Sequence, residues 1–364
     1  MKSEVRPYDV MLSGYYGFGN SGDEALLQAI LHDLRVCRPG IRIVVLSHSP
    51  EETAKRYGVK AVDRMKLSDV RRWMKKTKLL LSGGGSLIQD STSSQSLYYY
   101  LTLIQMAGRC GCRVMLYANG VGPVHSRWNR FFCGKILDRV DQITLREPDS
   151  LEELKKMGVT RPPALVTADP AIGLAPCPEE ETNRLLSSLH CERPLMISLR
   201  SWKNFDRDIS TEVKKYMIEM RSRYGCKSLL LPMQPSRDLE LCRRTAHGTD
   251  AVVLDPALSV EQVLGLMSKS TAVIGMRLHA LIYAAAAGTP PVGIVYDPKV
   301  EGYLRYMGLD SFLGVDQLNA AKLVQLTAKA VENGYGTDLT QMRRLAYQNA
   351  EIAVSLLDAQ PGKQ

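Results

Sequence analysis

An arginine and a histidine lie two positions apart, at Arg277 and His279, in the segment STAVIGMRLHALIYAAAAG. The β-branched apolar run Thr271–Ile274 predicts a buried strand, and the alanine-rich residues after His279 predict a helix. Arg277 and the unpaired N–H groups at the start of that helix could hold a phosphate or carboxylate, while the imidazole moves a proton near neutral pH. For an isolated Arg-x-His pair we would favour a structural role, in which Arg277 pairs with a carboxylate and His279 packs.

Two further chemical groups follow predicted strands. Arg146 comes directly after Gln142–Leu145, and Asp169 comes shortly after Leu165–Thr167. Because open parallel sheets bind ligands at the carboxyl ends of their strands, Arg146 and Asp169 are candidate site residues. The structural alternative for Arg146 is an ion pair with Glu147 or another nearby acid.

A glycine-rich turn, GYYGFGNSGDE, follows the predicted strand Tyr8–Ser13. It has neither the glycine spacing of a dinucleotide-binding fingerprint nor the Lys-Ser/Thr of a P-loop. Beside Gly19, the polar residues Asn20, Asp23 and Glu24 could accept hydrogen bonds from sugar hydroxyls. The two acids could equally complement the dipole of the helix that begins there.

A second glycine-rich turn follows the predicted strand Lys78–Ser82. It consists of Gly83, Gly84, Gly85 and Ser86. Three glycines at the carboxyl end of a strand permit a tight turn and close approach of a ligand. A purely structural turn would need fewer glycines, so we favour a binding role.

Strand and helix patterns alternate along the chain, which favours parallel sheets with right-handed crossovers. The segment LAPCPEEE has the composition of a linker, which we place at 174–182. We therefore expect an α/β protein with two Rossmann-like domains, at 1–173 and 183–336, that face each other across a cleft. Residues 337–364 are predicted to form a helix that packs across the domain junction, followed by a tail.

The formal net charge of +9 suggests an anionic partner. Eight scattered cysteines form no zinc-ligand pattern and fit a reducing cytoplasm. The N-terminus has no long apolar core, and the most apolar stretch, 280–296, is broken by Gly and Pro, so neither a signal peptide nor a membrane span is predicted. We expect a cytoplasmic protein without metal or cofactor.

The segment Arg64–Lys78 is strongly basic, with Asp69 as its one acid. Its apolar residues, Trp73 among them, recur at helical spacing, so the commoner interpretation is a solvated helix face over a packed stripe. The alternative is peripheral contact with anionic lipid at the inner face of the plasma membrane. The sequence has neither the aromatic-basic pattern of an RNA-binding sheet nor zinc-finger spacing, so no nucleic acid partner is expected.

In their order and spacing, these motifs resemble the polysaccharide pyruvyl transferase family, most closely its CsaB-type bacterial members. The resemblance spans Asp9 to Leu309 and rests on GYYGFGNSGDEAL, LSGGGSLIQD, LREPDS, ADP, VIGMRLHALIYAAAAGTP and YDPKV. It implies a fold like that of GT-B glycosyltransferases. It also implies transfer of pyruvate from phosphoenolpyruvate, a co-substrate, as a ketal onto O4 and O6 of a β-linked N-acetylmannosamine.

For CsaB-type members the implied acceptor is a lipid-linked GlcNAc–ManNAc disaccharide, a polyprenyl diphosphate precursor of secondary cell wall polymer. The family's Arg-Leu-His motif falls on Arg277, Leu278 and His279, and its other catalytic arginine falls on Arg146. We hypothesise that His279 acts as general acid or base, while Arg277 and Arg146 hold the donor.

The acceptor is expected to contact mainly the first domain, where Asp23 is a further catalytic candidate. His279, Asp169 and Glu24 are all candidates to protonate C3 of phosphoenolpyruvate. The predicted substrate-binding residues are Gly19, Asn20, Glu24, Gly84, Gly85, Ser86, Asp169 and Leu278.

Two other functions fit the same motifs. A GT-B nucleotide-sugar glycosyltransferase would need a ribose-binding carboxylate in the second domain, for which Glu261 or Glu301 could serve. A non-catalytic module that binds anionic or lipid-linked glycans would keep its ligand after loss of His279. Activity with phosphoenolpyruvate rather than a UDP-sugar separates these functions from a pyruvyl transferase.

Overall fold

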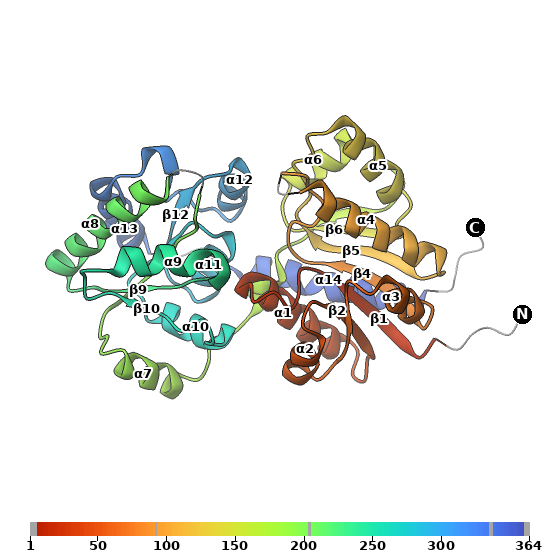
Figure 1. Ribbon diagram of the computed structural model, residues 1–364, viewed down its shortest axis with the longest axis horizontal. Coiled ribbons are helices and arrows are strands. Elements are labelled where there is room, and N and C mark those ends of the chain that lie inside the picture. Colours follow the sequence, from red (N-terminus) through yellow and green to blue (C-terminus); the bar gives the residue numbers. More distant parts are fainter. Residues whose placement is uncertain (1–5, 92, 203–204, 335–337, 360–364) are drawn as a thin grey trace, which may run out of the picture. The chain divides into compact units, whose positions relative to one another are not determined.

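The computed structural model describes residues 6–91, 93–202, 205–334 and 338–359, which form two compact units (Figure 1). Unit 1 comprises 1–19, 23–170 and 340–364, and unit 2 comprises 20–22 and 171–339. No helix in the described ranges is both long enough and apolar enough to cross a bilayer. All eight cysteines are described, and each is a free thiol.

Unit 1 is built on a seven-stranded parallel sheet in the order β3-β2-β1-β4-β5-β6-β7. Its central strands are almost wholly buried apolar runs, as expected for a parallel sheet covered on both faces. Side chains alternate between the faces: Val10 and Leu12 lie in one core and Met11 lies in the other. The strands are β1 (Tyr8–Ser13), β2 (Ile43–Ser47), β3 (Lys60–Asp63), β4 (Thr77–Gly83), β5 (Arg113–Asn119), β6 (Gln142–Leu145) and β7 (Ala164–Val166).

Helices cover both faces of this sheet. On one face α1 and α14 contribute Leu27, Ile30 and Ala350 to the core, and on the other α3, α4, α5 and α6 pack through residues such as Leu97 and Leu137. The C-terminal helix therefore belongs to the sheet of unit 1. The helices are α1 (Ser21–Cys37), α2 (Pro50–Tyr57), α3 (Leu67–Met74), α4 (Ser94–Arg109), α5 (Arg127–Leu137), α6 (Asp149–Lys156) and α14 (Thr340–Asp358).

Unit 2 contains a six-stranded parallel sheet in the order β10-β9-β8-β11-β12-β13. Helices α8, α9 and α13 share one apolar core with it, while α10 and α11 pack against strands β8, β11 and β12. The strands are β8 (Pro194–Ser198), β9 (Lys227–Leu230), β10 (Val252–Val253), β11 (Val273–Gly275), β12 (Pro291–Val295) and β13 (Phe312–Gly314). The helices are α7 (Glu179–Ser188), α8 (Asp206–Tyr224), α9 (Pro235–Ala246), α10 (Val260–Ser268), α11 (Leu278–Ala286), α12 (Pro298–Tyr306) and α13 (Ala320–Asn333), and 3-10 turns lie at Pro170–Gly173 and Val315–Gln317.

The strand order reverses direction once in each unit, between β1 and β4 in unit 1 and between β8 and β11 in unit 2. Open α/β sheets bind ligands at such switch points, outside the carboxyl ends of the strands. The glycine-rich turns follow β1 and β4, and Arg277 follows β11. Both switch points thus carry residues that the sequence marks as candidates.

The predicted fold class, with two parallel-sheet α/β domains, is confirmed. The chain passes from unit 1 to unit 2 between Pro170 and Ala171. Within the range 174–182, α7 already begins at Glu179.

Candidate functional site

In unit 2, Arg277 is the N-cap residue of α11 and follows the last residue of β11, Gly275, by two positions. Its backbone is extended (φ −89°, ψ 129°), and no side chain caps the helix. The first N–H groups of α11 therefore point out of the helix at the switch point, together with the positive end of the helix dipole. This is the arrangement that the sequence predicts.

The guanidinium of Arg277 is held by a buried carboxylate from α9. Its Nε and Nη2 donate to the two oxygens of Asp238, each at 2.7 Å, and Nη2 also donates to Oε1 of Gln234 at 3.2 Å. Asp238 is fully buried, whereas the arginine side chain is 12% exposed. The two-pronged pair fixes the plane of the guanidinium and leaves Nη1 without a hydrogen bond to any described residue. Arg277 thus has the structural ion pair and also keeps donor capacity for a ligand.

His279 follows on the first turn of α11 and packs against the segment Asn20–Gly22, which is grouped with unit 2. A Cβ on Gly22 would lie 2.3 Å from Nδ1 of His279, so only glycine fits beside the imidazole. The backbone N–H of Gly22 donates to Oδ1 of Asn20 at 3.1 Å, and the hydroxyl of Tyr283 donates to the carbonyl of Ser21 at 2.7 Å. Asn20 and His279 are far apart in the sequence, but both lie beside Gly22 in unit 2.

A cation that the sequence analysis missed lies at the neighbouring strand end. Arg200 comes two residues after β8, and the N–H of Met276 donates to the carbonyl of Ser198 at 2.9 Å, which joins the ends of β8 and β11. The guanidinium of Arg200 lies over the ring of Tyr296 at 4.7 Å, and its Nη1 donates to the hydroxyl of Tyr296. A charged side chain just after a buried strand is the signal used for Arg146 and Arg277, and it could have found Arg200.

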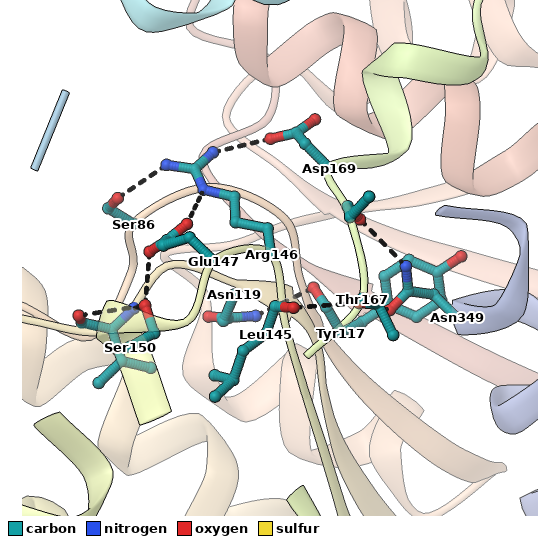
Figure 2. Close-up of polar contacts among 12 residues, drawn as sticks. Ser86, Tyr117, Asn119, Leu145, Arg146, Glu147, Ser150, Thr167, Asp169 and Asn349 are labelled. Atoms are coloured by element: carbon teal, nitrogen blue, oxygen red, sulfur yellow. Dashed lines mark hydrogen bonds and ion pairs between the residues drawn. The ribbon is translucent and has the colours of Figure 1, made fainter. Parts of the chain in front are cut away.

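In unit 1, Arg146 is the centre of a buried polar cluster at the carboxyl end of β6 (Figure 2). Its Nε donates to Glu147 at 3.0 Å, Nη1 to Asp169 at 2.8 Å and Nη2 to Ser86 at 3.1 Å. The side chains of Arg146, Glu147 and Asp169 are 4%, 2% and 0% exposed. The structure thus brings together three predicted site residues, Arg146, Asp169 and Ser86, but one positive group faces two negative ones. Such a cluster is a poor receptor for a further anion.

Neighbouring hydrogen bonds hold the cluster in place. The hydroxyl of Ser150 donates to Glu147 and accepts the N–H of Val121 at 2.7 Å. Below Asp169, Thr167 donates to Oδ1 of Asn349 in α14 at 2.8 Å, as Figure 2 shows. The predicted ion pair of Arg146 with Glu147 is therefore present, and the cluster is a rigid element of unit 1.

The glycine-rich turn after β4 lies against the start of α1. Gly84 and Gly85 have left-handed φ angles of 69° and 75°. A Cβ on Gly84 would lie 3.0 Å from Leu26, and one on Gly85 would lie 3.4 Å from Oδ1 of Asp23. Asp23, Gly84 and Gly85 are thus neighbours in unit 1, and their role in binding stays a prediction.

Glu24 lies apart from Asp23, because it points into the protein. Its carboxylate accepts the N–H of Gly17 and the hydroxyl of Tyr57, both at 2.8 Å, and the residue is 8% exposed. These contacts indicate a structural role for Glu24. Gly19, with a φ of 68°, has open space around its Cα.

The basic segment Arg64–Lys78 is divided by the fold. Arg64 is buried: it donates to the carbonyl of Gly14 at 2.8 Å and lies 4.5 Å from the ring of Tyr99. The prediction that Arg64 belongs to an exposed lipid-contacting patch is therefore wrong. Trp73 packs edge-on against Tyr8, with ring centroids 5.3 Å apart, and the remaining basic residues are exposed on and around α3.

The two carboxylates considered for ribose binding have different surroundings. Glu261 lies in the first turn of α10, and its carbonyl accepts the N–H of Cys177 at 2.8 Å. Glu301 lines a pocket of about 420 Å³ at the ends of β12 and β13, together with Asp297 and Asp316, and pairs with Arg305 at 2.8 Å. The described lining of this pocket contains no basic residue, so the pocket is unsuited to an anionic ligand.

Comparisons with known proteins show the family and the fold of the chain. A family model described as polysaccharide pyruvyl transferase matches residues 20–298. The chain is 22% identical over 360 residues to the amylovoran biosynthesis protein AmsJ of Erwinia amylovora, which covers 82% of this chain and 86% of the relative.

Solved structures show the same fold at low sequence identity. A UDP-GlcNAc 2-epimerase of Methanocaldococcus jannaschii has a TM-score of 0.65 and 12% identity, and the match covers 97% of this chain and 99% of the epimerase chain. MnaA of S. aureus, solved with UDP, has a TM-score of 0.64 and 12% identity, covering 98% and 100%. The fold is thus of the GT-B type.

Proposed function

The chain belongs to the polysaccharide pyruvyl transferase family, and on that premise we propose that it transfers the pyruvyl group of phosphoenolpyruvate onto a sugar as a ketal. The acceptor in this proposal is a β-N-acetylmannosamine, modified at O4 and O6, in a GlcNAc–ManNAc disaccharide on polyprenyl diphosphate. Such a product is a precursor of secondary cell wall polymer. The name of AmsJ supports a place for this chain in polysaccharide biosynthesis.

The observation that carries the donor assignment is the cationic switch point of unit 2. Arg200 and Arg277 follow neighbouring strands, and the open N-terminus of α11 lies beside Arg277. Phosphoenolpyruvate carries a phosphate and a carboxylate, which two guanidiniums and a helix N-terminus complement. Asp238 holds Arg277 in one orientation before the donor binds, so less entropy is lost on binding.

The proposed reaction forms two C–O bonds at C2 of phosphoenolpyruvate. One sugar hydroxyl oxygen bonds to C2 while C3 takes up a proton and becomes a methyl group. The bond between C2 and the phosphate oxygen then breaks, and the second hydroxyl oxygen bonds to C2. Of the two protons that the hydroxyls lose, one is accounted for at C3 and the other on the departing phosphate.

Within this reaction we assign proton transfer to His279, because its imidazole stands beside the anion site at the start of α11. Arg200 and Arg277 stabilise the charge of the departing phosphate. Asp23, Gly84 and Gly85 are proposed to contact the acceptor. Leu278 contributes its backbone N–H group at the helix start.

For Arg146 the contacts favour a positioning role. Its guanidinium already binds Glu147, Asp169 and Ser86, and it holds Ser86 at the end of the glycine-rich turn. Direct contact of Arg146 with the donor stays a prediction from the family resemblance. Protonation of C3 by Asp169 would first require release of its bond to Arg146.

The test is phosphate release from phosphoenolpyruvate, with and without a synthetic diphosphate-linked GlcNAc–ManNAc acceptor, followed by mass spectrometry. We expect acceptor-dependent release and a product heavier by one pyruvate ketal. Arg200→Gln should raise the KM for phosphoenolpyruvate roughly tenfold or more, through loss of a charged hydrogen bond. Arg207→Gln, at an exposed position on α8, is the matched control. Activity with a UDP-sugar but not with phosphoenolpyruvate would overturn the proposal in favour of a glycosyltransferase.

A further inference from the structure

The outer face of α5 is aromatic and exposed. Trp128, Phe131 and Phe132 are 73%, 53% and 42% exposed, although such side chains are usually buried. With Lys135 they occupy positions i, i+3, i+4 and i+7, which form one stripe along a helix. The opposite side of α5 is buried in the core of unit 1 through Cys133 and other residues.

The neighbouring helix α4 packs beside α5 (Figure 1) and adds one exposed ring to this stripe. Tyr98 on α4 is 42% exposed, and its ring lies 6.3 Å from that of Phe132. Its hydroxyl donates to Oδ1 of Asn129 at 2.7 Å, which fixes the ring in place. The rings of Phe131 and Phe132 are 5.7 Å apart. We call Tyr98, Trp128, Phe131 and Phe132 the α5 patch.

The surroundings of the α5 patch carry positive charge. Along α5 itself the basic residues Arg127, Arg130 and Lys135 occur without an Asp or Glu, and the acid at its C-cap, Asp138, pairs with Arg161 at 2.7 Å. Arg127 and Lys135 are exposed, and Nζ of Lys135 lies 5.8 Å from the ring of Phe131. An adjacent acid, Asp90, has its carboxylate engaged by the N–H groups of His125 and Ser126. Despite partial burial, these hydrogen bonds lower the pKa of Asp90.

We propose that the α5 patch docks unit 1 onto the surface of an anionic phospholipid bilayer. Tryptophan and tyrosine prefer the level of the lipid head groups, where an apolar ring and a polar tip are both accommodated. Exposed lysine and arginine beside them are attracted to anionic lipids. Charge complementarity thus favours an anionic bilayer, because a neutral protein partner would not pair with the exposed basic residues Arg127 and Lys135.

The position of the patch also suits a lipid-linked acceptor, a step that rests on the proposed function. Asp90 lies in the loop between β4 and α4, and it also binds the amide of Asn129 in α5 at 2.8 Å. The start of α5 is therefore fixed next to the loop that carries Gly83–Ser86. In this proposal, a sugar diphosphate at a membrane surface that contacts α5 would come near this loop, because Asp90 joins the loop to the start of α5.

The test is flotation of the full chain with vesicles of phosphatidylglycerol and phosphatidylcholine, compared with pure phosphatidylcholine. We expect binding to the anionic vesicles and a blue shift of tryptophan emission that Trp128→Phe largely removes. The variant Trp128→Ser/Phe131→Ser should bind at least roughly tenfold more weakly, because each lost aromatic ring removes apolar burial. Both substituted positions, Trp128 and Phe131, are exposed, so the variants should fold.

Two controls make the result specific. Ile218→Ser removes an exposed apolar side chain from α8 and should leave vesicle binding unchanged. Arg71→Gln/Lys75→Gln neutralises the exposed basic face around α3; loss of binding in that variant with full binding in Trp128→Ser/Phe131→Ser would overturn the proposal. Self-association that the aromatic variant abolishes, without vesicle binding by either protein, would instead assign the patch to a second copy. Vesicle binding without pyruvyl transfer would leave the docking surface standing and refute only the proposed function.

Discussion

Replacement of Arg146 by methionine tests the buried cluster of unit 1. Methionine has a similar length and fills the site, so the change removes the charge and the hydrogen bonds with little loss of packing. It leaves the carboxylates of Glu147 and Asp169, which are 2% and 0% exposed, without their shared cation. It also removes the donor that holds Ser86 at 3.1 Å.

The size of the effect follows from burial. Removal of one partner from a buried ion pair costs about 3–5 kcal/mol, because the remaining charge has lost its water and its counter-ion. Since a typical protein is stable by about 5–15 kcal/mol, Arg146→Met should remove a large fraction of the free energy of unfolding. Arg146→Lys should lose less, because lysine keeps the charge, but its single ammonium cannot reproduce the three directions of the guanidinium.

The assay is urea unfolding followed by far-ultraviolet circular dichroism, with the midpoint and slope both compared. The matched control is Arg72→Met, which breaks the exposed pair with Asp69, 2.9 Å long, and should cost less than about 1 kcal/mol. If Arg146→Met lost no more stability than this control, the buried carboxylates of Glu147 and Asp169 would not need Arg146 as their counter-ion. The reasoning from burial would then be refuted.

Three further predictions concern single side chains. Burial raises the pKa of Asp33 from 3.8 to about 7. The folded protein should therefore lose stability as the pH rises from about 4 to about 7, because the folded state must give up a proton that the unfolded state has already lost. In urea unfolding, Asp33→Asn should be as stable as the wild type near pH 4 and more stable than the wild type at pH 8. Asp238→Asn should lower kcat/KM for phosphoenolpyruvate at least roughly tenfold, because Arg277 loses the carboxylate that orients it; unchanged kinetics in the folded variant would argue against that role. Gly84→Ala should cost about 1–3 kcal/mol in urea unfolding, because φ is 69° and the new Cβ would lie 3.0 Å from Leu26; a neutral effect would mean that the turn can rearrange.

Much of the fold could be predicted because buried parallel strands are short apolar runs between turn residues. Tyr8–Ser13 and Gln142–Leu145 were delimited in the sequence as the structure has them. Helix α4 is not predicted from the sequence, because polar serines occupy its start. Strand β13, three residues long, carries too little pattern to be recognised.

The candidate site was predictable in its positions but not in its partners. A charge after a strand placed Arg146 and Arg277 at strand ends, since that depends on local sequence alone. Asp238, which binds Arg277, comes from a helix 39 residues away, and nothing in its own surroundings marks it. The burial of Arg64 was likewise hidden, because its aromatic neighbours come from other segments.

The return of α14 to unit 1 has a consequence for biosynthesis. Asn349 in that helix binds Thr167 and the carbonyl of Ala168, and Arg113 at the start of β5 donates to the carbonyl of Leu356. On the ribosome, all of unit 2 is made before this helix emerges. One apolar face of the sheet in unit 1 therefore lacks the cover of α14 until the synthesis of unit 2 is complete. Unit 2 is contiguous apart from 20–22 and has no such delay, so nascent-chain proteolysis should find the later-made domain protected first.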